Sequence, residues 1–313
     1  MKGAVVIRKH RSRAAKAAFA ISLGVAIVIG LFAAVLARPA HSASTTVIIG
    51  TKNFPEEFIL GQLYKQALEA KGFTVSYKEN IGSTELIQTS LTSGKINFYP
   101  EYTGVIVQVV FHKKSSPTTA LATWQLAKKL EAAKGYTVLN RTPFFDTDVV
   151  AVTNATAKKY GLKSIADLKK VGSFKFGGFP ECKTRNTCFV GYTKQYGITN
   201  ATFTPLAGIS AYAALDNGSI LAADVFSTDP PLGKGSKYTV LADPKHVTGF
   251  QNVAPIVKTS VVTSLGSKFT TTVNAVSAKL TQNAIVALNK AVIVDKQSAA
   301  SVASAFLKAN GLK

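Results

Sequence analysis

Apolar residues follow strand spacing and helix spacing in turn from about residue 46 onward. The predicted elements are a strand at 46–50, a helix at 55–71, a strand at 73–77, a helix at 82–94 and a strand at 96–99. Pro55 favours the start of the first helix, Gly72 its end, and Pro100 the end of the third strand. Strand and helix therefore alternate, and this order predicts an α/β layer with a mostly parallel sheet.

The same alternation returns in the second half of the chain. There the predicted elements are strands at 147–152, 175–177, 222–226 and 253–257, short helices at 165–170 and 212–217, and helices from about Gly266 to the end. We interpret the strand at 253–257 as one that returns between two lobes. The order of elements predicts two α/β lobes joined by two crossings of the chain.

The first 43 residues follow a different pattern. They hold seven basic residues and no acidic one, and an apolar run at 17–37 in which Ser22 is the only polar residue. A basic segment, an apolar run and then small residues form the layout of an export signal, and the run is also long enough to stay in a bilayer as an uncleaved anchor. Both alternatives predict that the rest of the chain lies outside the cytoplasm, in the periplasm or at the outer face of the cytoplasmic membrane.

The charge of the chain divides between this leader and the remainder. The 313 residues contain 37 basic and 16 acidic side chains, a formal net charge of +21. Seven basic residues belong to the leader, which leaves 30 basic and 16 acidic residues, or +14, in the predicted exported part. Outside the cytoplasm, such an excess favours solubility and attraction to anionic envelope polymers. We therefore expect no nucleic acid partner.

The sequence lacks the residue patterns of common catalytic and metal sites. Beyond the leader its histidines are His112 and His246, which lie far apart and outside any cluster with metal-ligand spacing. Phosphate-binding glycine loops and the nucleophile elbow of hydrolases are also missing from the sequence. We therefore expect a protein that is not an enzyme and that needs neither a metal nor a cofactor.

The two cysteines, Cys182 and Cys188, lie close together in the predicted exported part. Oxidising surroundings and an even cysteine count favour a disulfide that closes a short loop, and two buried thiols are the alternative.

Seven segments of the chain are similar to one known family. They are Gly50–Glu57, Ile81–Thr84, Tyr99–Gly104, Phe179–Glu181 with Arg185 after it, Tyr212–Gly218, Phe226–Asp229 and Phe306–Leu312. In this order they resemble the substrate-binding proteins of osmoprotectant ABC transporters, which bind glycine betaine, choline, carnitine and similar quaternary amines. The resemblance covers nearly all of the predicted exported part, and the Tyr-Pro-Glu-Tyr-Thr-Gly and Ser-Thr-Asp segments are the most diagnostic.

The resemblance implies a two-lobe periplasmic-binding-protein fold of type II, with the ligand in the cleft between the lobes. We expect lobe 1 to comprise residues 44–146 plus 254–313 and lobe 2 to comprise residues 147–253, after the leader at 1–43. The implied function is that of a monomeric receptor that binds a quaternary amine and delivers it to an ABC permease with its ATPase. The alternatives are a binder of another cationic or amino-acid-like solute and a membrane-anchored envelope scaffold with a basic surface.

The family holds a quaternary ammonium in a cage of aromatic rings, because a trimethylammonium has no N–H donor and is attracted to ring faces. The residues that the resemblance implies as ligand contacts are Tyr102, Phe226 and Phe250 as aromatic faces, with Gln251 replacing Phe250 if the alignment slips by one residue, and Lys52 and Arg185 as partners of a ligand carboxylate.

Two positions depart from the family pattern. Asp148 stands where another cage tyrosine is usual, and Val105 replaces a polar side chain that often meets the ligand. Asp148 either pairs with a basic residue or faces the ligand. In the second case it favours cations without a carboxylate, such as choline, or ligands with N–H donors. Arg185 lies midway between Cys182 and Cys188, so we expect a disulfide there to stiffen the loop that presents it.

Overall fold

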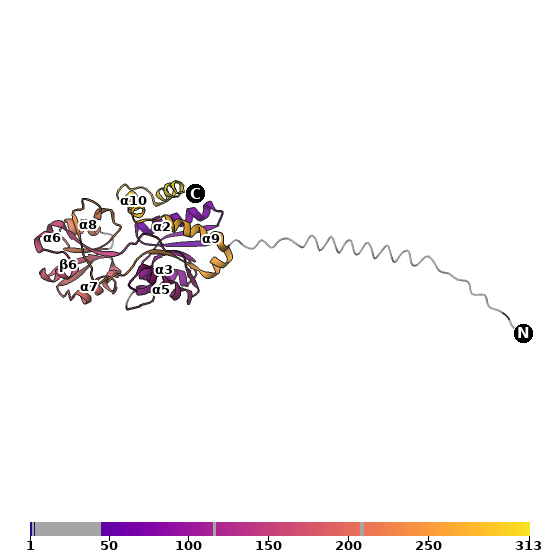
Figure 1. Cartoon of the computed structure of the whole chain (residues 1–313), viewed down its shortest axis with the longest axis horizontal. Helices are drawn as coiled ribbons and strands as arrows, with labels where there is room; N and C mark the ends of the chain where they lie inside the picture. The colour runs from indigo at the N-terminus through magenta and orange to yellow at the C-terminus, as the bar shows by residue number, and fades with distance from the viewer. Residues whose placement is uncertain (2, 4–44, 115–116, 207–209) are drawn as a thin grey trace. The chain divides into compact units, whose positions relative to one another are not determined.

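The computed structural model describes residues 1, 3, 45–114, 117–206 and 210–313. Apart from Met1 and Gly3, the predicted leader at 1–43 lies outside the described residues. Within the described ranges, no helix combines the length and the apolar character needed to cross a bilayer. The residues Thr45–Lys313 form one compact unit, and this unit contains two lobes, each built on its own sheet (Figure 1).

The sheet of the first lobe has five strands in the order β2-β1-β3-β10-β4. They are β1 (Val47–Lys52), β2 (Val75–Gly82), β3 (Phe98–Tyr102), β4 (Tyr136–Val138) and β10 (Val253–Lys258). The strand β1 pairs in parallel with β2 and β3, whereas β10 pairs antiparallel with both β3 and β4.

The sheet of the second lobe also has five strands, in the order β7-β6-β8-β5-β9. They are β5 (Asp148–Thr153), β6 (Phe174–Gly178), β7 (Ala201–Pro205), β8 (Ala222–Phe226) and β9 (Tyr238–Leu241). The strand β6 pairs in parallel with β7 and β8, and β5 pairs antiparallel with β8 and β9. Both sheets are thus mixed, and the prediction of mostly parallel sheets was wrong. The chain crosses from β4 to β5 and back from β9 to β10, and β5 and β10 each run against their neighbours.

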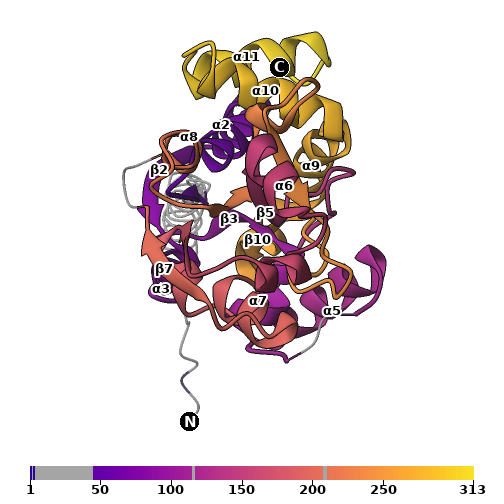
Figure 2. The same ribbon diagram turned by 90° about the vertical axis from the view of Figure 1, so that its left-hand side faces the viewer.

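Helices cover both sheets. In the first lobe they are α2 (Pro55–Ala70), α3 (Thr84–Thr92), α4 (Thr103–Val105), the π-helical turn η1 (Ile106–Val110), α5 (Ala120–Ala132), α9 (Thr259–Lys279), α10 (Gln282–Ile293) and α11 (Ala299–Ala309). In the second lobe they are α6 (Asn154–Tyr160), η2 (Ile165–Lys170), η3 (Pro180–Lys183), α7 (Phe189–Tyr196), α8 (Ala211–Asp216) and η4 (Pro230–Leu232). Figures 1 and 2 show the C-terminal helices α10 and α11 on the same side of the first lobe as α2.

Alternating side chains of the central strands fill two cores in each lobe. In β10, Val253 and Val257 face the core that α2 and α9 cover, whereas Ala254 and Ile256 face the core that α3 and α5 cover. In β5, Val150 faces the core beneath η2 and α7, and the next residue faces the core beneath α8. Each sheet is therefore covered on both faces, and its strand ends are left to form the cleft.

The strand β3 continues past the proline that was predicted to end it. Pro100 pairs with Pro255 of β10, so the missing N–H donors of both prolines fall on a single rung of the ladder. The strand therefore extends to Tyr102 and ends beside Lys52, the last residue of β1. Because the carboxyl ends of parallel strands meet at one edge of a sheet, this edge collects side chains at the cleft.

Candidate functional site

One cavity is lined by residues of both lobes. The first lobe contributes the ends of β1 and β3 and the start of α3, and the second contributes the start of β5, the end of β8 and the segment from Phe179 to Cys188. The segments that connect the two sheets add Asp146 and Gln251. Strand ends from two sheets meet here, as is usual for binding sites in open α/β folds.

Five of the six predicted ligand contacts line this cavity: Lys52, Tyr102, Asp148, Arg185 and Phe226. Val105, the second departure from the family pattern, lines it too. The structure does not bring Phe250 to this wall, because Phe250 lines a neighbouring cavity together with Thr248 and Asn252.

Gln251 takes the place next to the cavity that was predicted for Phe250. Its side-chain oxygen accepts a hydrogen bond from the backbone N–H of Val105 at 3.0 Å. Gly104 makes this approach possible, because a Cβ there would lie 2.7 Å from the Gln251 amide. The one-residue shift that the sequence left open is therefore the one that matches the geometry.

Aromatic rings from both lobes stack along the cavity. Phe54, which the sequence analysis did not single out, lies between Tyr102 and Phe226, with ring centroids 6.2 Å and 5.3 Å apart and interplanar angles of 28° and 23°. Phe179 extends the row, 5.8 Å from Phe226. Phe54 and Phe179 both lie inside segments that carry the family resemblance, so the signal for them was present in the sequence.

A buried carboxylate fixes the tyrosine of this row. The Tyr102 hydroxyl donates a hydrogen bond to Glu56 at 2.7 Å. Glu56 also accepts hydrogen bonds from the Thr228 hydroxyl at 2.7 Å and from the Asn289 amide at 2.8 Å. Burial raises the pKa of Glu56, and these hydrogen bonds oppose the rise. Glu56 thereby connects α2, β3, the segment after β8 and α10.

Lys52 faces the aromatic row but is already paired. Its ammonium lies 4.3 Å from the centroid of the Tyr102 ring and 5.4 Å from that of Phe54. The same nitrogen lies 2.5 Å from a carboxylate oxygen of Glu101 and 3.8 Å from one of Glu57. Burial raises the pKa of Glu57 to about 8, against the opposing charge of Lys52. The charge of Lys52 is thus balanced by carboxylates behind the site.

Arg185 is paired across the cavity. One of its terminal nitrogens lies 3.1 Å from each carboxylate oxygen of Glu85. Glu85 belongs to α3 in the first lobe, and Arg185 lies between η3 and α7 in the second lobe. Although burial opposes the change, the Ser83 hydroxyl and Arg185 lower the pKa of Glu85. This ion pair joins the two lobes at the edge of the cavity.

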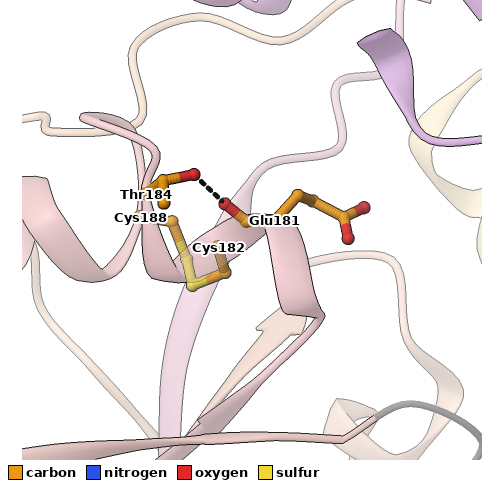
Figure 3. Close-up of a disulfide and its surroundings, with 4 residues drawn as sticks. All are labelled: Glu181, Cys182, Thr184 and Cys188. Carbon is orange, nitrogen blue, oxygen red and sulfur yellow. Dashed lines mark hydrogen bonds between the residues drawn. A yellow bond between two sulfur atoms is a disulfide. The ribbon is translucent and has the colours of Figure 1, made fainter. Parts of the chain in front are cut away.

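The predicted disulfide between Cys182 and Cys188 is confirmed, with Cα atoms 5.2 Å apart. Figure 3 shows it in the segment where the Thr184 hydroxyl donates a hydrogen bond to the Glu181 carbonyl at 3.3 Å, while the Glu181 side chain points away from the sulfur atoms. Both cysteines line the cavity. With Asp224 they also form a group of potential metal ligands, but the disulfide leaves no thiolate to act as one.

Carboxylates of the second lobe form the wall opposite Lys52. Asp148 lies at the start of β5, and withdrawal from water raises its pKa to about 6, opposed by Arg185 and Lys52. Among the described residues, no basic side chain lies within ion-pair distance of Asp148, so the structure favours a role at the cavity over a fixed ion pair. Asp224 was missed by the sequence analysis, because its place at the wall depends on how β8 pairs with β5.

The fold and this cavity define a class of protein. Two α/β lobes, each with a mixed sheet, are joined by two crossings and enclose a cavity lined by stacked rings and charged side chains. This is a solute-binding protein of the two-lobe, type II periplasmic-binding-protein class. Comparison with known proteins narrows the class: residues 45–309 match the family described as the substrate binding domain of ABC-type glycine betaine transport systems. The chain belongs to this family.

Two glycine betaine-binding proteins are similar to this chain over most of its length. A glycine-betaine-binding protein of Pseudomonas aeruginosa is 30% identical over 295 residues, which cover 90% of this chain and 92% of that protein. The glycine betaine-binding protein YehZ of Escherichia coli is 29% identical over 86% of this chain and 92% of its own length. The solved structure of ligand-free YehZ from the same species has a TM-score of 0.61 at 27% identity and covers 86% of this chain and all of that one.

Proposed function

We propose that this chain binds a quaternary amine of the glycine betaine, choline or carnitine class in the cavity between its lobes. The observation that carries the proposal is the row of Tyr102, Phe54, Phe226 and Phe179, which two lobes build together. A trimethylammonium is held by ring faces and by burial of its methyl groups. The names of the two relatives support the same class of ligand.

The position of the rings suggests how binding drives closure. Phe54 and Tyr102 belong to the first lobe, and Phe179 and Phe226 to the second. A cation that contacts rings of both lobes stabilises the arrangement in which the lobes are close together, with the two chain crossings as the hinge. We propose that this closed form is what an ABC permease recognises, that the receptor acts as a monomer outside the cytoplasm, and that it releases its ligand unchanged.

The charged groups narrow the choice within the class. A ligand carboxylate competes with Glu101 for Lys52 and with Glu85 for Arg185, because each base already has an acidic partner. Asp148 adds a negative charge on the opposite wall. Both features favour cations without a carboxylate over a zwitterion such as glycine betaine, and they also keep another cationic solute as the alternative ligand.

Ligand-induced thermal stabilisation tests the proposal. Melting of the purified full chain is measured with choline, glycine betaine, carnitine and a polyamine, each at about 100 times the expected micromolar dissociation constant. Because a ligand that binds only the folded state adds RT ln(1 + [L]/Kd), a true ligand raises the free energy of unfolding by about 3 kcal/mol. Stabilisation by a polyamine alone would point to the alternative solute class, and no stabilisation by any of the four would favour an envelope scaffold.

A further inference from the structure

Asp224 has an unmet hydrogen-bonding requirement at the cavity wall. Asp224 is only 4% exposed and lines the cavity, and its Oδ1 atom has no hydrogen-bond partner among the described residues. A buried carboxylate oxygen without a donor is costly, and native proteins rarely leave one. Nothing in the packing of β8 demands a carboxylate here, since the rest of that strand is apolar. The missing donor is therefore one that a ligand can supply.

The position of Asp224 places this acceptor beside a ring face. Asp224 and Phe226 are two residues apart on β8, so their side chains project from the same face of the sheet at a spacing of about 7 Å. Asp148 and Phe226 are paired across the two strands. A short ligand that holds its cation against Phe226 can thus reach Asp224 with its other end.

A matching donor without a partner lies on the same wall. The Nε atom of Arg185 is buried and has no hydrogen-bond acceptor within the described part of the chain, although one terminal nitrogen of Arg185 is held by Glu85. Burial and the neighbouring carboxylate of Asp148 raise the pKa of Asp224, and the charge of Arg185 opposes this rise. One free acceptor and one free donor therefore belong to two residues that line the same cavity.

A hydroxyl group fits this pair, because it donates one hydrogen bond and accepts another. A carboxylate can satisfy Arg185 but is repelled by the ionised form of Asp148, and an ammonium can satisfy Asp224 but leaves the Arg185 N–H unmatched. We infer that Asp224 and Arg185 bind a hydroxyl of the ligand, and that the solute is a quaternary amine with a hydroxyl in place of a carboxylate. This inference rests on the proposed function and specifies the ligand within that class.

Three probes separate the features of such a ligand. Choline carries the hydroxyl, ethyltrimethylammonium is the same cation without the oxygen atom, and glycine betaine carries a carboxylate instead. Calorimetric titration of the full chain should show choline binding at least about tenfold more tightly than ethyltrimethylammonium, the size expected for a hydrogen bond to a charged group. Glycine betaine should bind more weakly than choline.

Variants of Asp224 assign the preference to that residue. In Asp224→Asn, which keeps the shape and a weaker acceptor, the ratio of the choline affinity to the ethyltrimethylammonium affinity should fall at least threefold. In Asp224→Leu, which removes the acceptor, the ratio should approach one. Asp216→Asn, an exposed aspartate of α8 in the same lobe, is the matched control and should keep the ratio of the unmodified protein. If Asp224→Leu does not fold, the Asn variant decides the result.

The outcomes distinguish this inference from the proposed function. Tighter binding of glycine betaine than of choline, or a preference for choline that both folded Asp224 variants retain, overturns the hydroxyl site and leaves the quaternary-amine receptor intact. If neither the three probes nor carnitine binds, the proposed function is wrong and this inference is wrong with it.

Discussion

Phe54 stands out at the scale of single residues, because it stacks on a ring from each lobe. We predict that Phe54→Leu weakens choline binding about tenfold, since a ring face at a desolvated cation site contributes up to about 2 kcal/mol. Phe73→Leu is the control: Phe73 packs edge-on against Phe269 away from the cavity, so its loss should lower stability but not affinity. Titration calorimetry measures both variants, and equal affinity in Phe54→Leu and the unmodified protein would contradict the assignment.

Asp148 makes ligand binding depend on pH. Its pKa is about 6, and its ionised form attracts a cation, so protons compete with the ligand below that value. We predict that choline affinity rises between pH 5 and pH 7, and that Asp148→Asn flattens this part of the profile. The charge of choline itself does not titrate, which leaves the protein as the source of the change. A profile of the same slope in Asp148→Asn would assign it to other carboxylates.

The sequence located most of the site but not its chemistry. Tyr102, Phe226, Lys52 and Arg185 were reached through motif positions, and Asp148 through a departure from them. The ion pairs of the site could not be predicted, because they depend on contacts in the folded structure. Only the contacts with Glu101 and Glu85 reveal that Lys52 and Arg185 are already neutralised. Whether the Asp224 oxygen has a hydrogen-bond donor depends on all the residues that pack around β8, and a local sequence pattern does not predict these contacts.

At the scale of elements, the loop closed by the Cys182–Cys188 disulfide, here called the disulfide loop, positions Arg185 at the cavity. We predict that Cys182→Ser/Cys188→Ser remains folded but loses about 2 kcal/mol of stability, the chain-entropy value for a loop of about seven residues. Ligand affinity should fall as well, because the free loop has more conformations to lose on binding. Denaturant unfolding and calorimetry of the double variant measure the two effects. Unchanged affinity would show that the loop is rigid without its disulfide.

The ion pair between α3 and the disulfide loop sets the availability of Arg185. We predict that Glu85→Gln releases Arg185 and raises the affinity for glycine betaine relative to choline about threefold or more. Glu69→Gln, which removes an exposed ion pair with Lys65 on α2, is the matched control and should leave the ratio unchanged. A ratio in Glu85→Gln equal to that of the unmodified protein would mean that Arg185 does not meet the ligand carboxylate.

Element boundaries were predictable where spacing and breakers agree, as in α2, which runs from Pro55 to Ala70. Boundaries that depend on the pairing of strands within the sheet were not predictable. Pro100 lies inside β3 because Pro255 faces it across the sheet, and the antiparallel β5 and β10 follow from the route of the chain between lobes. Neither the pairing of the two prolines nor the antiparallel direction of these strands can be predicted from the spacing of apolar residues.

At the scale of the whole molecule, buried carboxylates link stability to pH. Burial raises the pKa of Glu131 to about 7, so the folded state binds more protons than the unfolded state between about pH 4.5 and 7. Stability therefore falls as pH rises through this window. We predict that Glu131→Gln gains up to about 3 kcal/mol over the unmodified protein at pH 8 and little at pH 5. Urea unfolding at the two pH values measures this, and an equal effect at both would contradict the pKa.

The whole molecule is proposed to close its two lobes on a quaternary ammonium held between their aromatic rings. Calorimetric titration of the full chain with choline tests this most directly. We predict saturable binding of one choline per chain in the micromolar range, with a negative heat-capacity change from the burial of methyl groups against the rings. Absence of binding heat at several temperatures, together with an unchanged melting temperature, would contradict the account.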